Sequence, residues 1–315
     1  MSSWSTVAFM FPGQGSQVVG MGQDIADAYP VARQTFEQAD DLLGFSLSSL
    51  CFNGPADDLN DTINTQPALY VCGIATLRAL QSEQPQATAA FAAGHSFGEF
   101  TALAAFGALS FEDGLWLVRE RGRLMKQAGE QSPGAMAAIL ALDIDAVRDL
   151  CARARAATGG VLVVANDNCP GQVVISGDNA TLDQALVLAK EAGARRTLKL
   201  AVSIAAHSPL MRPSADEFRQ ALAQTTFHAP QVPIYGNVSA APLTDVDAIR
   251  AELGAQLINP VRWRESMQAM IADGAQVFVE IGPKDVLTGL LRRIDDGKVT
   301  VNLNSSENIH KFRED

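Results

Sequence analysis

The first apolar run of the chain, VAFMF at residues 7–11, constrains the fold more than any other feature. Five consecutive apolar residues ending at Pro12-Gly13 indicate a short strand buried on both faces, the usual environment of a strand in a parallel sheet. Similar runs follow along the chain and alternate with stretches of helical spacing. The predicted strands are 7–11, 88–93, 277–281 and 299–303, and the predicted helices are 66–80, 97–108, 110–128 and 286–292. This alternation predicts an α/β fold with a mainly parallel sheet covered on both faces.

The stretch 134–203 has a different rhythm, strand-helix-strand-strand-helix-strand, which is typical of a ferredoxin-like unit. Its predicted elements are 134–140, 144–157, 161–166, 172–176, 181–192 and 196–202. Because the alternating pattern resumes afterwards, this unit is interpreted as an insertion. We therefore expect an α/β-hydrolase-like large subdomain, 1–130 with 204–315, and a ferredoxin-like small subdomain, 131–203. The polar tail, 304–315, is expected to fray.

The composition argues against several classes of protein. Hydrophobic residues make up 47% of the 315 residues and charged residues 19%, as in a globular enzyme. The net charge of −11 argues against a nucleic-acid partner, because phosphate neutralisation needs clustered Lys and Arg. No apolar run approaches the roughly 18–20 residues that cross a membrane, and the N-terminus lacks a signal-peptide pattern. We expect a soluble, cytoplasmic protein with no membrane association, whose four scattered cysteines are buried free thiols.

The segment Gly94-His95-Ser96-Phe97-Gly98 fits the pattern G-x-S-x-G between a predicted strand and a predicted helix. A sharp turn there exposes the serine, and the flanking glycines remove side chains that would collide. The new helix directs its N-terminal amides at the reaction centre. A chance match is the alternative, but the strand–helix context favours Ser96 as an acyl-transfer nucleophile.

The chain offers four histidines as the base that Ser96 needs. One lies beside Ser96 at an extended strand end, where its side chain should point away, and two lie in polar segments: His95, His228 and His310. His207 follows an apolar strand at a sheet edge, from which its side chain can reach a cleft. Elimination therefore favours His207, and the alternative is that it caps the next helix through Ser208.

Arg121 lies on the apolar side of its predicted helix. Helix positions advance about 100° each, so Arg121 lies about 200° from Arg119, between Leu117 and Met125. An arginine among core positions needs an anionic partner. That partner is either a structural carboxylate, such as Glu99, or the carboxylate of a substrate.

Gly13 and Gly15 flank Gln14 directly after the first strand. Two glycines there allow the backbone N–H of Gln14 to approach a substrate closely, as an oxyanion-binding donor must. An ordinary strand–helix turn is the alternative.

Several longer motifs occur in one order along the chain. They are FPGQGSQ (11–17), GHSFGE (94–99), RGRLM (121–125), NCPGQVVISG (168–177), VSIAAHSPLM (202–211), QLINPVRW (256–263) and EIGPKDVL (280–287). In sequence and spacing, from about residue 7 to residue 304, they resemble the malonyl-CoA:acyl carrier protein transacylases of fatty-acid and polyketide synthesis.

The resemblance implies a role for each matching residue. The nucleophile is Ser96, and the base is His207, oriented by the backbone carbonyl of Gln256. The backbone amides of Gln14 and Phe97 form the oxyanion hole. These five residues are the expected catalytic set.

The resemblance also implies the substrates and partners. Arg121 grips the free carboxylate of malonate with two parallel hydrogen bonds, and Asn168 is expected to contact substrate by motif position only. The expected partners are malonyl-CoA and an acyl carrier protein, with coenzyme A thioester as substrate and no metal or redox cofactor. The expected carrier docking patch is Arg195, Arg196 and Lys199, for which a solvated charged face is the alternative.

The chain departs from the family pattern at Phe97 and Phe100, where Leu and Tyr are common, and at Ala205-Ala206, where bulkier or hydroxylated residues are frequent. The resemblance implies that these positions line the acyl pocket, so a substituted malonyl extender stays open beside malonyl. Two further alternatives are an acyl-carrier-protein acyl hydrolase on the same fold and a catalytically inactive docking module of a larger synthase.

Overall fold

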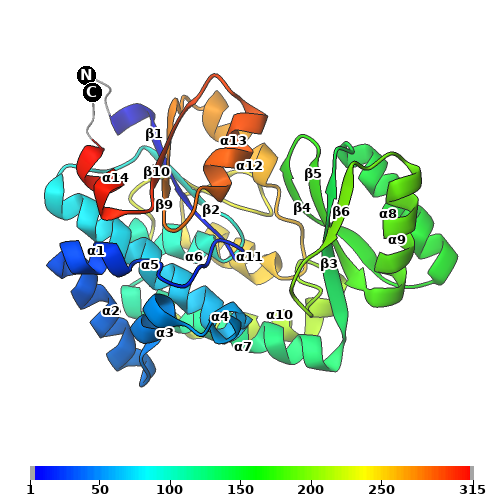
Figure 1. The fold of residues 1–315 in the computed structure, drawn as a ribbon, viewed down its shortest axis with the longest axis horizontal. Coiled ribbons are helices and arrows are strands. Elements are labelled where there is room, and N and C mark those ends of the chain that lie inside the picture. Colours follow the sequence, from blue (N-terminus) through cyan, green and yellow to red (C-terminus); the bar gives the residue numbers. More distant parts are fainter. Residues whose placement is uncertain (1–3, 313–315) are drawn as a thin grey trace.

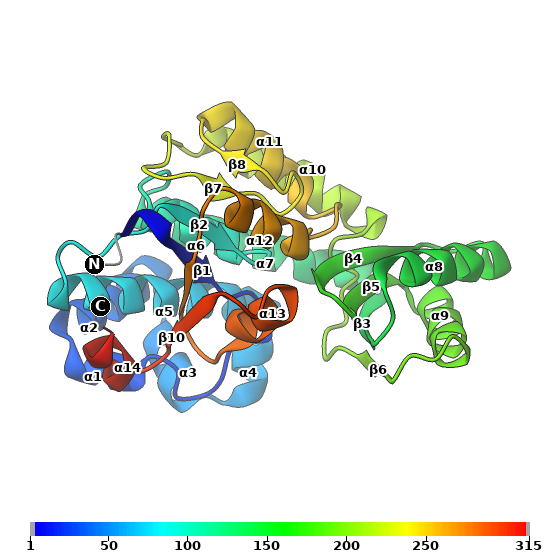
Figure 2. The ribbon, with the colours of Figure 1, turned by 90° about the horizontal axis from the view of Figure 1, so that it is seen from above.

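The structure is a computed structural model, and it describes residues 4–312. Two sheets lie in two parts of the molecule (Figure 1). The larger part holds a six-stranded sheet between helices, and the smaller part extends from it on one side (Figure 2). This mixed α/β architecture confirms the predicted fold class.

The large sheet has the strand order β10-β9-β1-β2-β7-β8 and is parallel except for the pairing of β7 with β8. The strands are β1 (Val7–Phe11), β2 (Phe91–Gly94), β7 (Ile234–Tyr235), β8 (Pro242–Leu243), β9 (Val277–Ile281) and β10 (Val299–Leu303). The strands β1, β9 and β10 have the predicted bounds, whereas β2 begins three residues later than predicted.

Helices form most of the rest of the large part. They are α1 (Gln23–Ala28), α2 (Pro30–Leu43), α3 (Leu47–Asn53), α4 (Ala56–Asn60), α5 (Thr62–Glu83), α6 (Gly98–Ala105), α7 (Phe111–Gln131), α10 (Arg212–Gln224), α11 (Val246–Gln256), α12 (Trp263–Ala272), α13 (Val286–Ile294) and α14 (Ser306–Lys311). The Ser110 side chain caps α7 by accepting from the Asp113 N–H.

The central strand β1 is buried on both faces, as the apolar run predicts. Val7, Phe9 and Phe11 join one core with residues of α5, α6 and α7. Ala8 and Met10 face the opposite side and join a second core with α12 and α13. Figure 2 shows α5 and α12 on opposite sides of β1. The carboxyl end of β1 therefore lies between two layers of helices.

The small sheet has the order β4-β5-β3-β6 and is antiparallel. Its elements follow the predicted order: β3 (Gly134–Leu140), α8 (Ile144–Thr158), β4 (Leu162–Cys169), β5 (Gln172–Asp178), α9 (Asn179–Glu191) and β6 (Arg196–Lys199). Helices α8 and α9 pack on one face of this sheet (Figure 1). The division into 1–130 with 204–315 and 131–203 stays a prediction, although the strand pairing agrees with it.

Several other predicted bounds differ from the structure: β6 ends at Lys199 rather than at 202, α6 ends at Ala105 rather than at 108, and β4 continues to Cys169 rather than ending at 166. An irregular segment, 200–208, follows β6. Residues 306–311 of the tail, expected to fray, form α14, where Ile309 is buried and Ser305 caps the helix. The last three residues of that prediction, 313–315, lie outside the described residues. Among the described residues, no helix combines the length and apolar character needed to cross a membrane.

Candidate active site

Ser96 lies in a sharp turn between β2 and α6, with a positive φ of 54°. The glycines around it permit this turn. A Cβ on Gly94 would lie 1.9 Å from the main chain of Gly98, and a Cβ on Gly98 would lie 2.4 Å from the Phe11 carbonyl oxygen. Only glycine fits at these two close approaches, so the turn that exposes Ser96 is fixed by its neighbours.

Asn237 braces this turn from the loop after β7. Its Oδ1 accepts from the Ser96 N–H at 2.7 Å, and its Nδ2 donates to the Gly94 carbonyl at 2.8 Å. The Asn237 side chain is buried. The sequence analysis missed this residue, because a single Asn in a loop 141 positions from Ser96 carries no spacing signal. Since the Ser96 amide is engaged, the donors of an oxyanion hole must be other N–H groups.

His207 lies beside Ser96, at 2.9 Å between its Nε2 and the serine Oγ. Its Nδ1 lies 2.9 Å from the Gln256 carbonyl oxygen and 3.2 Å from that of Asn259. Because carbonyls only accept, Nδ1 carries the proton and Nε2 is free to take the Ser96 proton. The His207 ring itself does not cap the next helix. The cap of the turn that follows is the Ser208 side chain.

The His207 ring is neutral at ordinary pH. Burial and the nearby Arg121 cation lower its pKa to about 3, although the carbonyls of Gln256 and Asn259 oppose this shift. The backbone of His207 is also in the left-handed region, with φ of 58°. A strained, buried and neutral imidazole held against a serine is suited to general-base chemistry.

The prediction that the His95 side chain points away from Ser96 is wrong, because His95 lines the same cavity as Ser96. Its Nε2 bonds to Asn168 Oδ1 at 2.8 Å, and its ring packs against Trp263. It is therefore engaged elsewhere and is no rival to His207. The cavity lining includes Asn166 rather than Asn168, so Asn168 contacts His95 instead of the cavity.

The main-chain N–H groups of Gln14 and Phe97 belong to two residues that line the same cavity as Ser96. Within residues 4–312, neither donates a hydrogen bond to the protein. A Cβ on Gly13 would lie 2.6 Å from the His95 carbonyl oxygen, so this loop packs directly against the serine turn. The Gln14 side chain is anchored to Thr62 Oγ1 at 3.1 Å.

Arg121 is buried in α7, with 1% of its surface exposed. Its Nη2 lies 3.1 Å from Ser96 Oγ and 2.9 Å from Gln256 Oε1, and its Nη1 lies 3.0 Å from Gln66 Oε1. The structure does not show the alternative pairing with Glu99, because no ion pair joins Arg121 to a carboxylate among the described residues. Burial lowers the pKa of this guanidinium, because desolvation disfavours its charge, and Glu99 opposes the shift.

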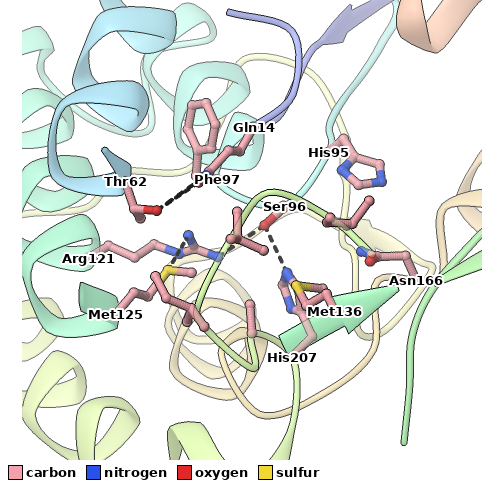
Figure 3. Close-up of a pocket in the computed structure, with 14 residues that line it drawn as sticks. Gln14, Thr62, His95, Ser96, Phe97, Arg121, Met125, Met136, Asn166 and His207 are labelled. Atoms are coloured by element: carbon pink, nitrogen blue, oxygen red, sulfur yellow. Dashed lines mark hydrogen bonds between the residues drawn. The ribbon is translucent and has the colours of Figure 1, made fainter. Parts of the chain in front are cut away.

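Ser96 thus lies between the Arg121 guanidinium and the His207 ring, at the wall of a cavity of about 110 Å³ (Figure 3). The cavity is lined by Gln14, Thr62, His95, Ser96, Phe97, Arg121, Met125, Met136, Asn166, Leu200, Val202, Ile204, Ala206 and His207. Of the four departures from the family pattern, Phe97 and Ala206 line it. Phe100 does not, because it packs against Phe218 in the core, and Ala205 is buried outside the lining.

The predicted docking patch lies on the edge strand β6 and the residue before it. Arg195, Arg196 and Lys199 are exposed, and Lys199 pairs with Asp183. Two arginines therefore remain without an ion pair among the described residues, at the edge of the small sheet.

Comparison with known proteins shows the family of this chain. Residues 8–303 match the family described as acyl transferase domain. The malonyl CoA-acyl carrier protein transacylase of Escherichia coli (strain K12) is 45% identical over 289 residues, covering 92% of this chain and 93% of that protein. The relative of the same name from Haemophilus influenzae is 42% identical over 307 residues, 98% of each chain.

Solved structures give the same result. An acyl carrier protein S-malonyltransferase from Vibrio cholerae has a TM-score of 0.92 at 43% identity, covering 97% of this chain and 99% of that one. A structure of a type II polyketide synthase acyl-carrier protein in complex with its malonyl-transacylase has a TM-score of 0.93 at 39% identity, covering 96% and 97%. The chain therefore belongs to the acyl transferase family and, within it, to the malonyl CoA-acyl carrier protein transacylases.

Proposed function

We propose that this protein transfers a malonyl group from coenzyme A to the phosphopantetheine thiol of an acyl carrier protein, through an ester on Ser96. One observation carries the proposal: the Ser96 hydroxyl lies within hydrogen-bond distance of a neutral imidazole and of a buried guanidinium that pairs with no carboxylate of residues 4–312. The first group activates the hydroxyl, and the second selects an acyl group that carries its own carboxylate.

In the first half-reaction, His207 Nε2 takes the Ser96 proton as Oγ attacks the thioester carbonyl. The N–H groups of Gln14 and Phe97 stabilise the oxyanion. The carbon–sulfur bond then breaks, and coenzyme A leaves with the proton from His207. In the second half-reaction the carrier thiol loses its proton to His207 and attacks the ester, and Ser96 recovers its proton as the ester bond breaks.

Arg121 links substrate binding to the strength of the base. In the free protein its positive charge lowers the pKa of His207, second only to burial. A malonyl carboxylate bound to Arg121 would neutralise part of that charge and make the imidazole more basic. The carbonyls of Gln256 and Asn259 fix the ring, although they stabilise an imidazolium less than a carboxylate would. A thioester tolerates this weaker base, because it opens more easily than an amide.

The relatives are named as transacylases, so the hydrolase and the substituted-malonyl alternatives are not favoured. The scheme uses side chains, main-chain amides and the coenzyme A thioester, with no step assigned to a cofactor. For the carrier, we propose docking near Arg195, Arg196 and Lys199, supported by the exposure of these cations on an otherwise acidic protein. Asn168 is proposed to act only through His95.

Intact-protein mass spectrometry tests the proposed reaction. The wild-type protein mixed with malonyl-CoA should gain the mass of one malonyl group, lose it on addition of a phosphopantetheinylated carrier, and gain little from acetyl-CoA. Ser96→Ala should gain nothing, whereas Ser203→Ala, a change at an exposed serine beside the cleft, should be loaded normally. Loading of Ser96→Ala, or equal loading by the two acyl groups, would contradict the proposal.

Docking is tested separately. Arg196→Glu should slow transfer to the carrier, and added salt should abolish the difference from wild type, because charge attraction is screened. Arg153→Glu, which places the same charge change on α8, is the matched control. Equal rates for both variants and the wild type at low salt would exclude this surface.

A further inference from the structure

The main chain of Gln256 holds His207, whereas its side chain lies between Arg121 and Glu99. The Oε1 atom accepts from Arg121 Nη2 at 2.9 Å. The Nε2 atom donates to the Ser96 carbonyl at 3.0 Å and to Glu99 Oε2 at 2.6 Å. Both amide hydrogens are used by acceptors, so the amide has only one orientation that satisfies its neighbours. Its carbonyl oxygen must face the guanidinium.

Glu99 is the carboxyl group that would otherwise pair with Arg121. It lies in the first turn of α6, fully buried, and its Oε1 has no hydrogen-bond partner in the described part of the chain. Burial, and then the carboxylate of Glu252, raise the pKa of Glu99, which favours its neutral form. The Gln256 amide therefore separates a buried guanidinium from a buried carboxyl group.

The other acceptors around the guanidinium are neutral as well. They are the Ser96 hydroxyl, the Gln66 amide and the Met125 sulfur, and the Arg121 Nε has no partner among the residues that the structure describes. A neutral acceptor orients the guanidinium without cancelling its charge. A carboxylate at the same position would form a charge-assisted pair and would compete with an incoming anion.

We propose that the Gln256 side chain is a positioning residue for acyl selectivity: it holds Arg121 in place with a neutral acceptor and keeps it from Glu99, so that the positive charge stays available to the acyl carboxylate. This inference rests on the proposed function. It assigns Gln256 two separable roles, one for each half of the residue. The main-chain carbonyl orients the base, and the side-chain amide preserves the anion receptor.

Gln256→Glu tests the side chain alone, because the main-chain carbonyl that contacts His207 remains. We measure kcat/KM for loading of Ser96 by malonyl-CoA and by acetyl-CoA in rapid-quench experiments read by intact mass. Malonyl loading should fall about 100-fold, since an internal carboxylate replaces the substrate's charge-assisted bonds. Acetyl loading should fall much less than malonyl loading, because an acetyl group makes no bond to Arg121, so the malonyl-to-acetyl ratio should fall at least about tenfold.

Gln256→Met is the second variant, in case the added carboxylate prevents folding. It removes the neutral acceptor without adding charge, so the malonyl-to-acetyl ratio should fall about tenfold through a higher KM for malonyl-CoA. Gln220→Glu, on the exposed face of α10, is the matched charge control and should behave as wild type.

A parallel loss with both acyl groups would show that the side chain only supports the fold or the base, and it overturns the inference. A malonyl-to-acetyl ratio within about threefold of wild type in every folded Gln256 variant overturns it as well. Failure of the proposed function is distinct, because then the wild-type protein itself would not load malonyl or would not prefer it.

Discussion

The pH dependence of Ser96 acylation tests the environment of His207 directly. An ordinary histidine has a pKa of about 6.5, so only about 3% would be neutral at pH 5. With a pKa of about 3, His207 is almost entirely neutral at pH 5. We therefore expect kcat/KM for malonyl loading to stay within about twofold between pH 7.5 and pH 5, where an ordinary histidine would lose about 30-fold.

The physical origin of this shift gives a second, sharper expectation. A pKa of about 3 in place of 6.5 corresponds to about 5 kcal/mol against the imidazolium, from burial first and Arg121 second. A bound malonyl carboxylate cancels part of the Arg121 contribution. The acid limb of kcat, which reports the complex, should therefore lie at higher pH than the limb of kcat/KM, which reports the free enzyme.

The assay is rapid-quench loading at limiting and at saturating malonyl-CoA from pH 2.5 to 8, with the acyl-enzyme measured by intact mass. Circular dichroism at each pH shows that the fold persists, and the isolated acyl-enzyme shows that the ester survives the quench. Half-loss of kcat/KM near pH 6.5 would refute the buried neutral imidazole. Coincident limbs for kcat and kcat/KM would refute the coupling to Arg121.

Three other expectations follow from the site. Arg121→Ala should lower malonyl kcat/KM by about 10²–10⁴, because two charge-assisted hydrogen bonds of about 1.5–3 kcal/mol each are lost. Acetyl loading should be kept or gained. Unchanged malonyl loading would contradict the binding of the malonyl carboxylate by Arg121. Asn237→Ala should lower kcat about 10–100-fold with both acyl groups, because the Ser96 turn loses two buried hydrogen bonds; unchanged kcat for both in the loading assay would exclude the bracing role. Gly94→Ala should lower the free energy of unfolding by more than about 3 kcal/mol in urea melts, since its Cβ would overlap the Gly98 main chain. Gly289→Ala, which meets open space within α13, is its control, and equal stability of the two would contradict the steric argument.

The sequence predicts the strands well where apolar runs end at a turn signal. The strand β1 ends before Pro12-Gly13, and β9 ends before Gly282-Pro283, both as predicted. Pro and Gly stop a strand through their own backbone, so no tertiary information is needed. Helix α14 has no such local signal. It forms because Ile309 finds a buried place against the large part, which a polar sequence alone does not reveal.

The motifs predict which residues lie together at the site, but not which hydrogen bonds their side chains form. The Gln256 amide meets the Ser96 carbonyl 160 positions away, and Asn237 meets the Ser96 amide from another loop. Such contacts depend on the relative depth and rotation of packed elements. The prediction for His95 is wrong for the same reason. The alternation of side chains along a strand does not continue into the turn, where the His95 ring forms a hydrogen bond with Asn168.

The two sheets contribute unequally to the cavity. The hydroxyl and the guanidinium belong to the large part, whereas Met136 on β3 and Asn166 on β4 come from the small one. The reactive side chains thus come from the large part, whereas the small part supplies some of the cavity wall. Substitutions on the small sheet can therefore change the shape of the cavity without moving the Ser96 hydroxyl or the Arg121 guanidinium. The preference for one acyl group over another can change in this way while the reactive residues stay the same.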